Sequence, residues 1–182
     1  RYNSLLLFNI SKTRAELLAG KDIRRGFICF DICERGKLRH IKSVHFSEEL
    51  CKNHFAQHHI PNFHPLLIYD NGASQQGKGT QFATNRLTAH LRRHFRKYGR
   101  EGGILLIDFS DYFGNVAHEP LFKIYRQIFT DPRVIALGMS FISAFGDKGL
   151  GLGSETSQIN AVMLPNRADH YAKEVLRIRG YG

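Results

Sequence analysis

The chain has 182 residues, a hydrophobic fraction of 42% and a formal net charge of +10. This length fits one domain or slightly more, and the hydrophobic fraction supports a core and argues against disorder. A globular domain this basic usually meets a polyanion, most often nucleic acid, although a basic surface without a ligand is the alternative. No apolar run approaches the ~18 residues of a membrane span, so we expect no membrane partner.

The cysteines Cys29, Cys33 and Cys51 form no paired framework, so we interpret them as reduced thiols in a cytoplasmic protein. Cys29 and Cys33 lie near His40 and His45 in the sequence, which makes a zinc site conceivable, but the spacing matches no standard finger.

The first 44 residues predict a helix and a hairpin. Residues 1–20 fit a short amphipathic helix that stops at Gly20, and residues 26–31 and 38–44 fit two strands joined by a turn at 34–37. The return strand carries basic side chains that could clamp phosphate groups, or that simply discourage strand pairing at a solvated edge. These side chains are Lys37, Arg39 and Lys42.

Residues 46–59 predict a second helix, with Ser47 as its start and two acids in its first turn. His54 and His58 are one helical turn apart and could share a metal, or could belong to a solvated basic face. Pro61 and Pro65 then end the helix.

Residues 72–80 nearly match the phosphate-binding loop G-x-x-x-x-G-K-[ST], with an apolar run at 66–69 as the preceding strand and a helix following. The hydroxyl residue must directly follow Lys78, but Gly79 stands there. Thr80 comes one position late, which rotates its hydroxyl by about 100° round the helix. A P-loop NTPase is therefore an alternative that the motif fits imperfectly.

Residues 80–97 predict the clearest helix of the chain. Ala83, Leu87, Leu91 and Phe95 keep an i, i+4 spacing, so we expect one stripe to face the core. The remaining sides are basic without an acid, which favours contact with a phosphate backbone over a merely solvated face. The candidate nucleic-acid-binding residues are Lys78, Arg86, Arg92, Arg93, Arg96 and Lys97.

Residues 104–107 are four consecutive aliphatic residues after two glycines, and they predict a buried strand that ends on Asp108. A carboxylate at the end of a buried strand is a common position for a metal-binding acid. Phe109, Tyr112 and Phe113 predict a tight turn whose rings stand beside it. A solvated strand end is the ordinary alternative.

The remaining chain predicts helices at 118–129, with Pro120 in the first turn, and from Asp131 onward. A glycine-rich stretch follows at 149–157, which either lets the backbone approach a ligand closely or serves as a flexible hinge. It is not a dinucleotide fingerprint, because a helix precedes it and its third glycine falls too early. A helix at 158–176 should kink near 162–164 because of Pro165.

Four of these segments together resemble a reverse transcriptase of the bacterial retroelement type, similar to group II intron enzymes and prophage-borne relatives. Residues 108–118 resemble the first palm motif, D-x-x-x-[FY]-F-x-x-[IV]-x-H. Residues 149–157, running on to Ala161, Asn166 and Asp169, resemble G-x-P-Q-G-S-x-x-S-P-x-x-A-N. Residues 36–39 and 72–80 resemble two segments of the fingers. The sequence departs from the pattern at Leu152, Gln158 and Val162.

The resemblance implies an α+β fold, with helices packed on a small antiparallel sheet as the fingers (1–98) and part of the palm (99–182) of a right-hand polymerase. It implies RNA-directed DNA synthesis, in which a primer on an RNA template is extended with deoxynucleotides by two Mg²⁺ (or Mn²⁺) ions. The implied partners are a template–primer duplex, deoxynucleoside triphosphates and a structured RNA.

The resemblance also implies residue roles. Asp108 and the Phe109 carbonyl would bind metal, and Asp108 would be the catalytic acid. The backbone of Asp111, Tyr112 and Phe113 would hold the triphosphate, and Phe113 would exclude a ribose 2′-hydroxyl. Lys37 and Arg39 would grip the triphosphate. Gly153 and Ser154 would lie under the template base or the nucleotide.

The family also needs a Y-x-D-D pair of acids after the last helix, and the sequence stops at Gly182, about where that strand should begin. Because two metal ions need several carboxylates, we expect the 182-residue chain to be unable to polymerise by itself. A non-catalytic basic RNA-binding module and the P-loop NTPase are the competing hypotheses.

Overall fold

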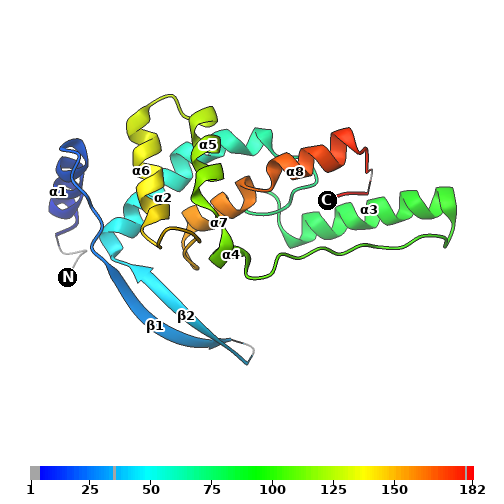
Figure 1. Ribbon diagram of the computed structural model, residues 1–182, viewed down its shortest axis with the longest axis horizontal. Coiled ribbons are helices and arrows are strands. Elements are labelled where there is room, and N and C mark those ends of the chain that lie inside the picture. Colours follow the sequence, from blue (N-terminus) through cyan, green and yellow to red (C-terminus); the bar gives the residue numbers. More distant parts are fainter. Residues whose placement is uncertain (1–4, 35, 179) are drawn as a thin grey trace.

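The computed structural model describes residues 5–34, 36–178 and 180–182, with the side chains of 59–62 outside the description. It shows helices and one two-stranded antiparallel sheet, which confirms the α+β class (Figure 1). In chain order the elements are α1 (Leu6–Leu18), β1 (Phe27–Glu34), β2 (Lys37–Val44), α2 (Phe46–His59), the 3₁₀ helix η2 (Ile60–Leu66), α3 (Thr80–Tyr98), α4 (Tyr112–Asn115), α5 (His118–Ile128), α6 (Pro132–Ser143), α7 (Glu155–Met163), α8 (Asn166–His170) and the π-helical turn η3 (Tyr171–Val175).

The predicted hairpin is confirmed and projects from the helical body (Figure 1). Its register runs from Phe27 opposite Val44 at the base to Glu34 opposite Lys37 at the tip. Because side chains alternate along a strand, Phe27 and Lys42 share one face while Phe30 and Ile41 share the other. The first face turns toward the body, since the Phe27 ring lies 5.1 Å from that of Phe145.

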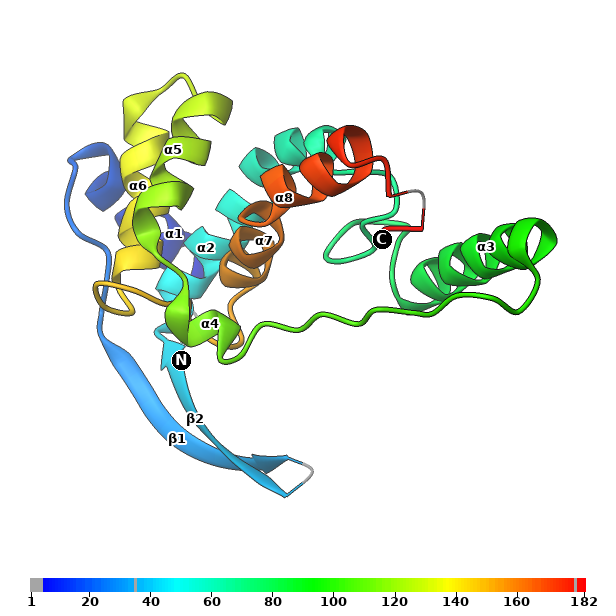
Figure 2. The same cartoon turned by 45° about the vertical axis from the view of Figure 1, so that its right-hand side comes forward.

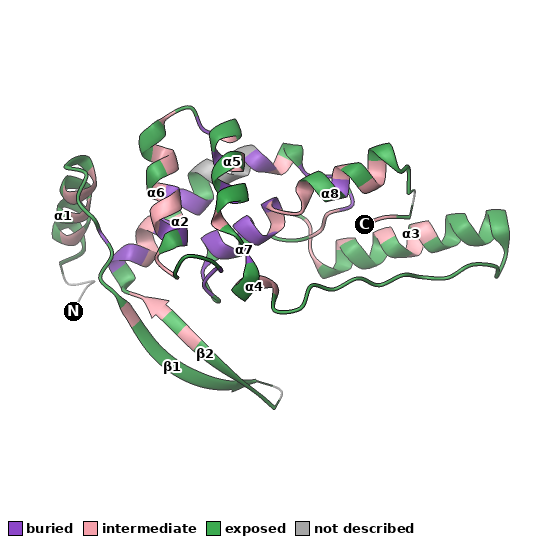
Figure 3. Cartoon of the chain, in the orientation of Figure 1, coloured by how far each residue is buried: buried purple, intermediate pink, exposed green. Residues whose placement is uncertain are grey.

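The core lies between α2, α5, α6 and α7, where the buried residues concentrate (Figure 3). Its centre is aromatic, with the Phe55 ring 6.3 Å from Tyr125 and 5.9 Å from Phe141. The buried Tyr125 hydroxyl donates to Asn160 Oδ1 at 2.9 Å, so its polar atom is satisfied. Burial raises the pKa of Tyr125.

The expected kink in the last helix is confirmed. α7 ends at Met163 and α8 begins at Asn166, so the helix is interrupted by the two-residue turn Leu164–Pro165. Proline has no N–H to donate to the preceding turn, and its ring crowds the carbonyl four residues earlier.

The predicted buried strand at 104–107 is wrong. These residues are extended without a strand partner, and their exposed fractions run from 66% for Ile104 to 88% for Leu106. An aliphatic run is buried on both faces only when neighbouring strands and covering helices flank it. The sheet of the described residues is the hairpin, which lies at the opposite side of the molecule (Figure 1).

The predicted burial of the α3 stripe is also wrong, although the helix itself is confirmed. α3 buries none of its residues, and Leu87, Leu91 and Phe95 are 50%, 42% and 59% exposed. The helix extends away from the body, and the chain that follows returns beside it in both views (Figures 1 and 2). Periodicity identifies an apolar face but does not supply the element that covers it.

The segment at 66–69 is not a strand either. The 3₁₀ helix η2 runs to Leu66, and a turn follows in which the Asn71 N–H donates to Ile68 O at 3.1 Å. The carbonyl of Leu66 accepts hydrogen bonds from Asn166 Nδ2 at 3.1 Å and His170 Nε2 at 2.7 Å. The Leu66 carbonyl, which would bond to a neighbouring strand in a sheet, is therefore hydrogen-bonded to side chains of α8.

Candidate functional site

An open pocket of about 460 Å³ lies where three distant segments of the chain meet. The return strand of the hairpin forms one wall, the turn that contains α4 forms the second, and the glycine-rich loop forms the third. Its lining residues are Arg39, His40, Lys42, Asp111, Tyr112, Phe113, Gly114, Phe145, Lys148, Gly149, Leu150, Gly151 and Leu152.

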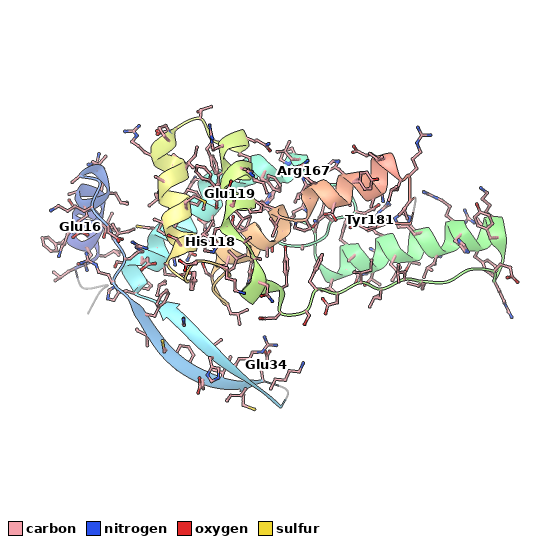
Figure 4. The ribbon with its side chains drawn as sticks, in the orientation of Figure 1. Glu16, Glu34, His118, Glu119, Arg167 and Tyr181 are labelled. Atoms are coloured by element: carbon pink, nitrogen blue, oxygen red, sulfur yellow. The ribbon has the colours of Figure 1, made fainter. Side chains whose placement is uncertain are left out.

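The α4 turn and the glycine-rich loop are joined by their backbones. The N–H of Gly149 donates to Val116 O and the N–H of Leu150 donates to Phe113 O, both at 2.7 Å. His118, at the N-terminal end of α5 (Figure 4), has its Nε2 2.7 Å from Gly149 O. A carbonyl only accepts, so His118 carries its proton on Nε2 and donates it here. Two walls of the pocket are therefore one connected unit.

The α4 turn depends on an unusual backbone at Asp111, whose φ of 45° and ψ of 48° are left-handed. Only a few per cent of non-glycine residues adopt this conformation. The Asp111 carboxylate folds over Gly114, where an added Cβ would meet a carboxylate oxygen at 2.5 Å. A glycine at position 114 therefore gives the turn the room it needs.

Tyr112 ties this turn to the core. Its hydroxyl donates to Ala161 O in α7 at 2.7 Å, and its ring stacks on Phe109 with 5.2 Å between centroids. Burial, followed by the nearby charge of Asp169, raises the pKa of Tyr112. The aromatic turn expected beside Asp108 is thus present.

The pocket is strongly basic. Arg39, Lys42 and Lys148 line it against the single carboxylate of Asp111. Lys148 Nζ donates to Asn115 Oδ1 at 3.1 Å, which fixes its position. Among the described residues, the ion pair of Arg39 is an exposed one with Glu34, which leaves its guanidinium group available to a ligand. Cations beside ring faces and glycine backbone suit a phosphorylated ligand with an aromatic base.

Four of the expected nucleotide-binding residues line this pocket: Arg39, Asp111, Tyr112 and Phe113. Lys37, Gly153 and Ser154 do not. Lys37 sits at the hairpin tip opposite Glu34, while Ser154 is buried with its hydroxyl 2.8 Å from that of Thr156.

The pocket also contains His40, Phe145 and Lys148, which were not among the expected nucleotide-binding residues. His40 and Lys148 directly follow or precede motif residues, so adjacency could have found them. Phe145 lies four residues before the glycine-rich loop and no local signal identifies it.

Asp108 lies three residues before the pocket wall formed by Asp111. Its side chain is exposed and makes no ion pair within the described part of the chain. Mg²⁺ commonly takes one or two carboxylates together with water and substrate phosphate. The Asp108 carboxylate and the Phe109 carbonyl are oxygen ligands of the type that Mg²⁺ prefers.

No group of three His, Cys, Asp or Glu side chains among the described residues is placed to hold a metal by itself. Of the metal alternatives, Cys29 and Cys33 are exposed on the hairpin. The rings of His54 and His58 lie 4.3 Å apart on α2.

Two of the expected nucleic-acid-binding residues are engaged within the chain. Lys78 Nζ donates to the carbonyls of Tyr69 at 2.9 Å and Asn71 at 3.2 Å, and Arg86 hydrogen-bonds to Asp70. The other four are exposed on the outer half of α3: Arg92, Arg93, Arg96 and Lys97.

Asp70 is a buried acid that sequence reasoning missed. Arg86, His90 and Lys173 all contact its carboxylate, which joins α3 to the C-terminal segment. Burial acts to raise the pKa of Asp70, but the hydrogen bonds from Arg86, Lys173 and His90 outweigh it and hold the pKa well below its usual range. In the sequence Asp70 stands before Asn-Gly and reads as part of a turn, so nothing local indicates its burial or its three cationic partners.

The C-terminal residues close the same network. Lys173 Nζ also donates to Tyr181 O at 2.5 Å, and Tyr181, labelled near α3 in Figure 4, donates its hydroxyl to Asp169 at 2.6 Å. This hydrogen bond raises the pKa of Tyr181 to about 12.

No family model matches this chain, and no curated protein matches it. Among its described residues, no helix combines the length and apolar character needed to cross a membrane.

Proposed function

We propose that this chain is the nucleotide-binding part of an RNA-directed DNA polymerase of the bacterial retroelement type. The observation that carries the proposal is the pocket itself. The three segments that resemble the fingers hairpin, the first palm motif and the glycine-rich motif stand far apart in the sequence and form its three walls.

The proposal assigns roles to the chain's own groups. Arg39, Lys42 and Lys148 neutralise phosphate oxygens, and the backbone of the α4 turn orients them. The Phe113 ring, which lines the pocket, would oppose a ribose 2′-hydroxyl. Asp108 and the Phe109 carbonyl would hold a divalent ion, which supplies charge neutralisation at the reacting phosphate when bound. In the same proposal, residues 1–98 form the fingers and residues 99–182 form part of the palm.

Two features of Asp108 support this role over a structural one. The carboxylate is exposed and forms no ion pair with another described residue, and the basic pocket begins three residues later at Asp111. An acid with a purely structural role would be expected to find a partner, as Asp70 does.

The decisive experiment replaces Asp108 with Ala in the full-length protein and compares primer extension on an RNA template with RNA affinity. We expect extension to fall by at least about 1,000-fold while the affinity for RNA stays within about twofold, because the acid acts on metal and not on the RNA backbone. Asp147→Ala, an exposed acid in the loop after α6, is the matched control and should change neither. Wild-type protein that binds RNA but extends no primer would favour the non-catalytic RNA-binding module.

The structure gives the P-loop NTPase less support than the sequence did. The residues before the loop form a 3₁₀ helix and a turn rather than a strand. The Lys78 ammonium group is held by two backbone carbonyls and lies over the rings of Tyr69 and Phe82. A second hollow of about 270 Å³ borders this loop and α7. Tight ATP binding that is lost in Lys78→Ala would restore that hypothesis.

A further inference from the structure

A lysine and a glutamate are buried together in α2, and neither takes part in the site described above. Lys52 and Glu48 are one helical turn apart, with side-chain exposures of 0% and 2% and 3.0 Å between Nζ and Oε1. The two atoms are in ion-pair contact but outside hydrogen-bond geometry. An apolar pair of the same volume would fill this space without the cost of removing two charges from water. The pair therefore calls for an explanation beyond stability.

The contacts of the pair lead toward the pocket. Lys52 Nζ lies 4.9 Å from the centre of the Phe145 ring and 5.7 Å from that of Phe141, both within cation–π range. Glu48 Oε2 accepts a hydrogen bond from the N–H of Arg25 at 3.5 Å, just before the hairpin begins. One end of the pair thus contacts a pocket wall, and the other contacts the entry to the hairpin.

Phe145 is the side chain through which the pair would act. It lines the pocket, its ring lies 5.1 Å from Phe27 at the base of the hairpin, and it fills the space beside Gly151. A Cβ added to Gly151 would come within 2.0 Å of that ring. Phe145 therefore contacts both the base of the hairpin and the glycine-rich loop.

We propose that the Lys52–Glu48 ion pair is a positioning device for the pocket. The Lys52 ammonium group, held by Glu48, fixes the position of the Phe145 ring. Through that ring, the ion pair sets how closely the basic hairpin approaches the glycine-rich loop. The pair tunes the affinity for the phosphorylated ligand without touching it. That the ligand is a deoxynucleoside triphosphate rests on the proposed function, whereas the effect on pocket geometry does not.

The test uses the double variant Glu48→Gln/Lys52→Met in the full-length protein, because removing one partner alone would strand a buried charge. The matched control is Glu119→Gln/Lys123→Met, an i, i+4 pair on α5 with exposures of 68% and 70%. In primer extension, we expect the α2 variant to raise the KM for deoxynucleotide roughly 10- to 100-fold, the loss that a misplacement of about 1 Å can cause. The kcat and the affinity for RNA should stay within about twofold, and the control should match wild type.

A second readout does not need catalysis. Amide hydrogen exchange at residues 149–151 and at the hairpin base should quicken in the α2 variant and not in the control. Unchanged exchange, or a parallel loss of kcat and RNA affinity, would overturn the positioning role. Quicker exchange in a protein that binds no nucleotide would support the positioning role while the proposed function fails.

If the double variant does not fold, Glu48→Asp replaces it. This change keeps both charges and withdraws the carboxylate by one methylene. We expect it to shift exchange and KM in the same direction by a smaller factor. Wild-type values for both quantities in Glu48→Asp would contradict the proposal.

Discussion

At the scale of single residues, Asp70 is the clearest point where one side chain holds distant segments together. Its carboxylate contacts Arg86 and His90 from α3 and Lys173 from η3. We expect Asp70→Asn to lower the free energy of unfolding by about 2–3 kcal/mol, measured by urea denaturation. The loss stays below that of a fully buried pair because Arg86 and Lys173 keep some contact with water.

The control is Asp22→Asn, whose ion pair with Arg24 is exposed and should contribute within about 0.5 kcal/mol. The pH dependence follows from the depressed pKa of Asp70. The stabilisation is fully present above the unfolded-state pKa of about 3.9 and is lost as the pH falls below it. Wild type should therefore lose stability faster than Asp70→Asn between about pH 4 and pH 2, and parallel curves would contradict this account.

Gly138 shows a second residue-scale constraint, this time steric. A Cβ at this position of α6 would meet Tyr125 at 2.4 Å and Phe55 at 2.7 Å in the core. Ala is normally favoured over Gly inside a helix by about 1 kcal/mol. Here we expect Gly138→Ala to lower the unfolding free energy by about 1–3 kcal/mol, because overpacking outweighs propensity. Gly103→Ala, which meets open space, should change it by less than about 0.5 kcal/mol.

At the scale of elements, α3 and the hairpin are the two projecting arms of the molecule (Figure 2). The outer half of α3 carries four exposed cations, and Asp70 holds the inner half through Arg86 and His90. If α3 contacts single-stranded RNA, each phosphate contact contributes about 0.7 to the slope of log K against log salt.

We expect Arg92→Gln/Arg96→Gln to lower that slope by about 1.4, measured by fluorescence anisotropy with labelled RNA at several salt concentrations. The matched control removes two exposed cations from α5, as Lys123→Gln/Arg126→Gln. Equal reductions in both variants would show that general charge, and not α3, binds the RNA.

At the scale of the whole molecule, the described residues leave unusually large apolar areas uncovered. Residues 104–107 and the three large side chains of the α3 stripe (Leu87, Leu91 and Phe95) are more than 40% exposed, and such apolar areas promote association. Leu105→Lys/Leu106→Lys should reduce concentration-dependent self-association in analytical ultracentrifugation. The unfolding free energy should change by less than about 0.5 kcal/mol, because both side chains are already more than 80% exposed. A loss above about 2 kcal/mol would show instead that these residues are buried as the sequence predicted.

Local rules accounted for most elements and for four of the residues that line the pocket: Arg39, Asp111, Tyr112 and Phe113. Glycine and proline positions, caps and periodicity gave α1, the hairpin, α2, α3, α5, α6 and the kink at Pro165. The motifs led to Arg39 and to the α4 turn. Three expectations failed. Residues 66–69 form the end of a 3₁₀ helix and a turn rather than a strand, and the α3 stripe and residues 104–107 are exposed rather than buried. Burial depends on which other element arrives to cover a face, and local sequence does not contain that information. The place of Phe145 in the pocket and the Lys52–Glu48 pair were missed because both depend on how distant elements meet.

The backbone links between the α4 turn and the glycine-rich loop have an evolutionary consequence. Because main-chain groups make the bonds from Gly149 to Val116 and from Leu150 to Phe113, these bonds do not depend on the side chains of Val116, Leu150 or Phe113, whereas Gly114 and Gly149 leave no room for a Cβ. Selection can thus alter what the cavity prefers while its framework persists. Substitutions at Leu152 or Lys148 offer a route to new ligand selectivity on an inherited scaffold.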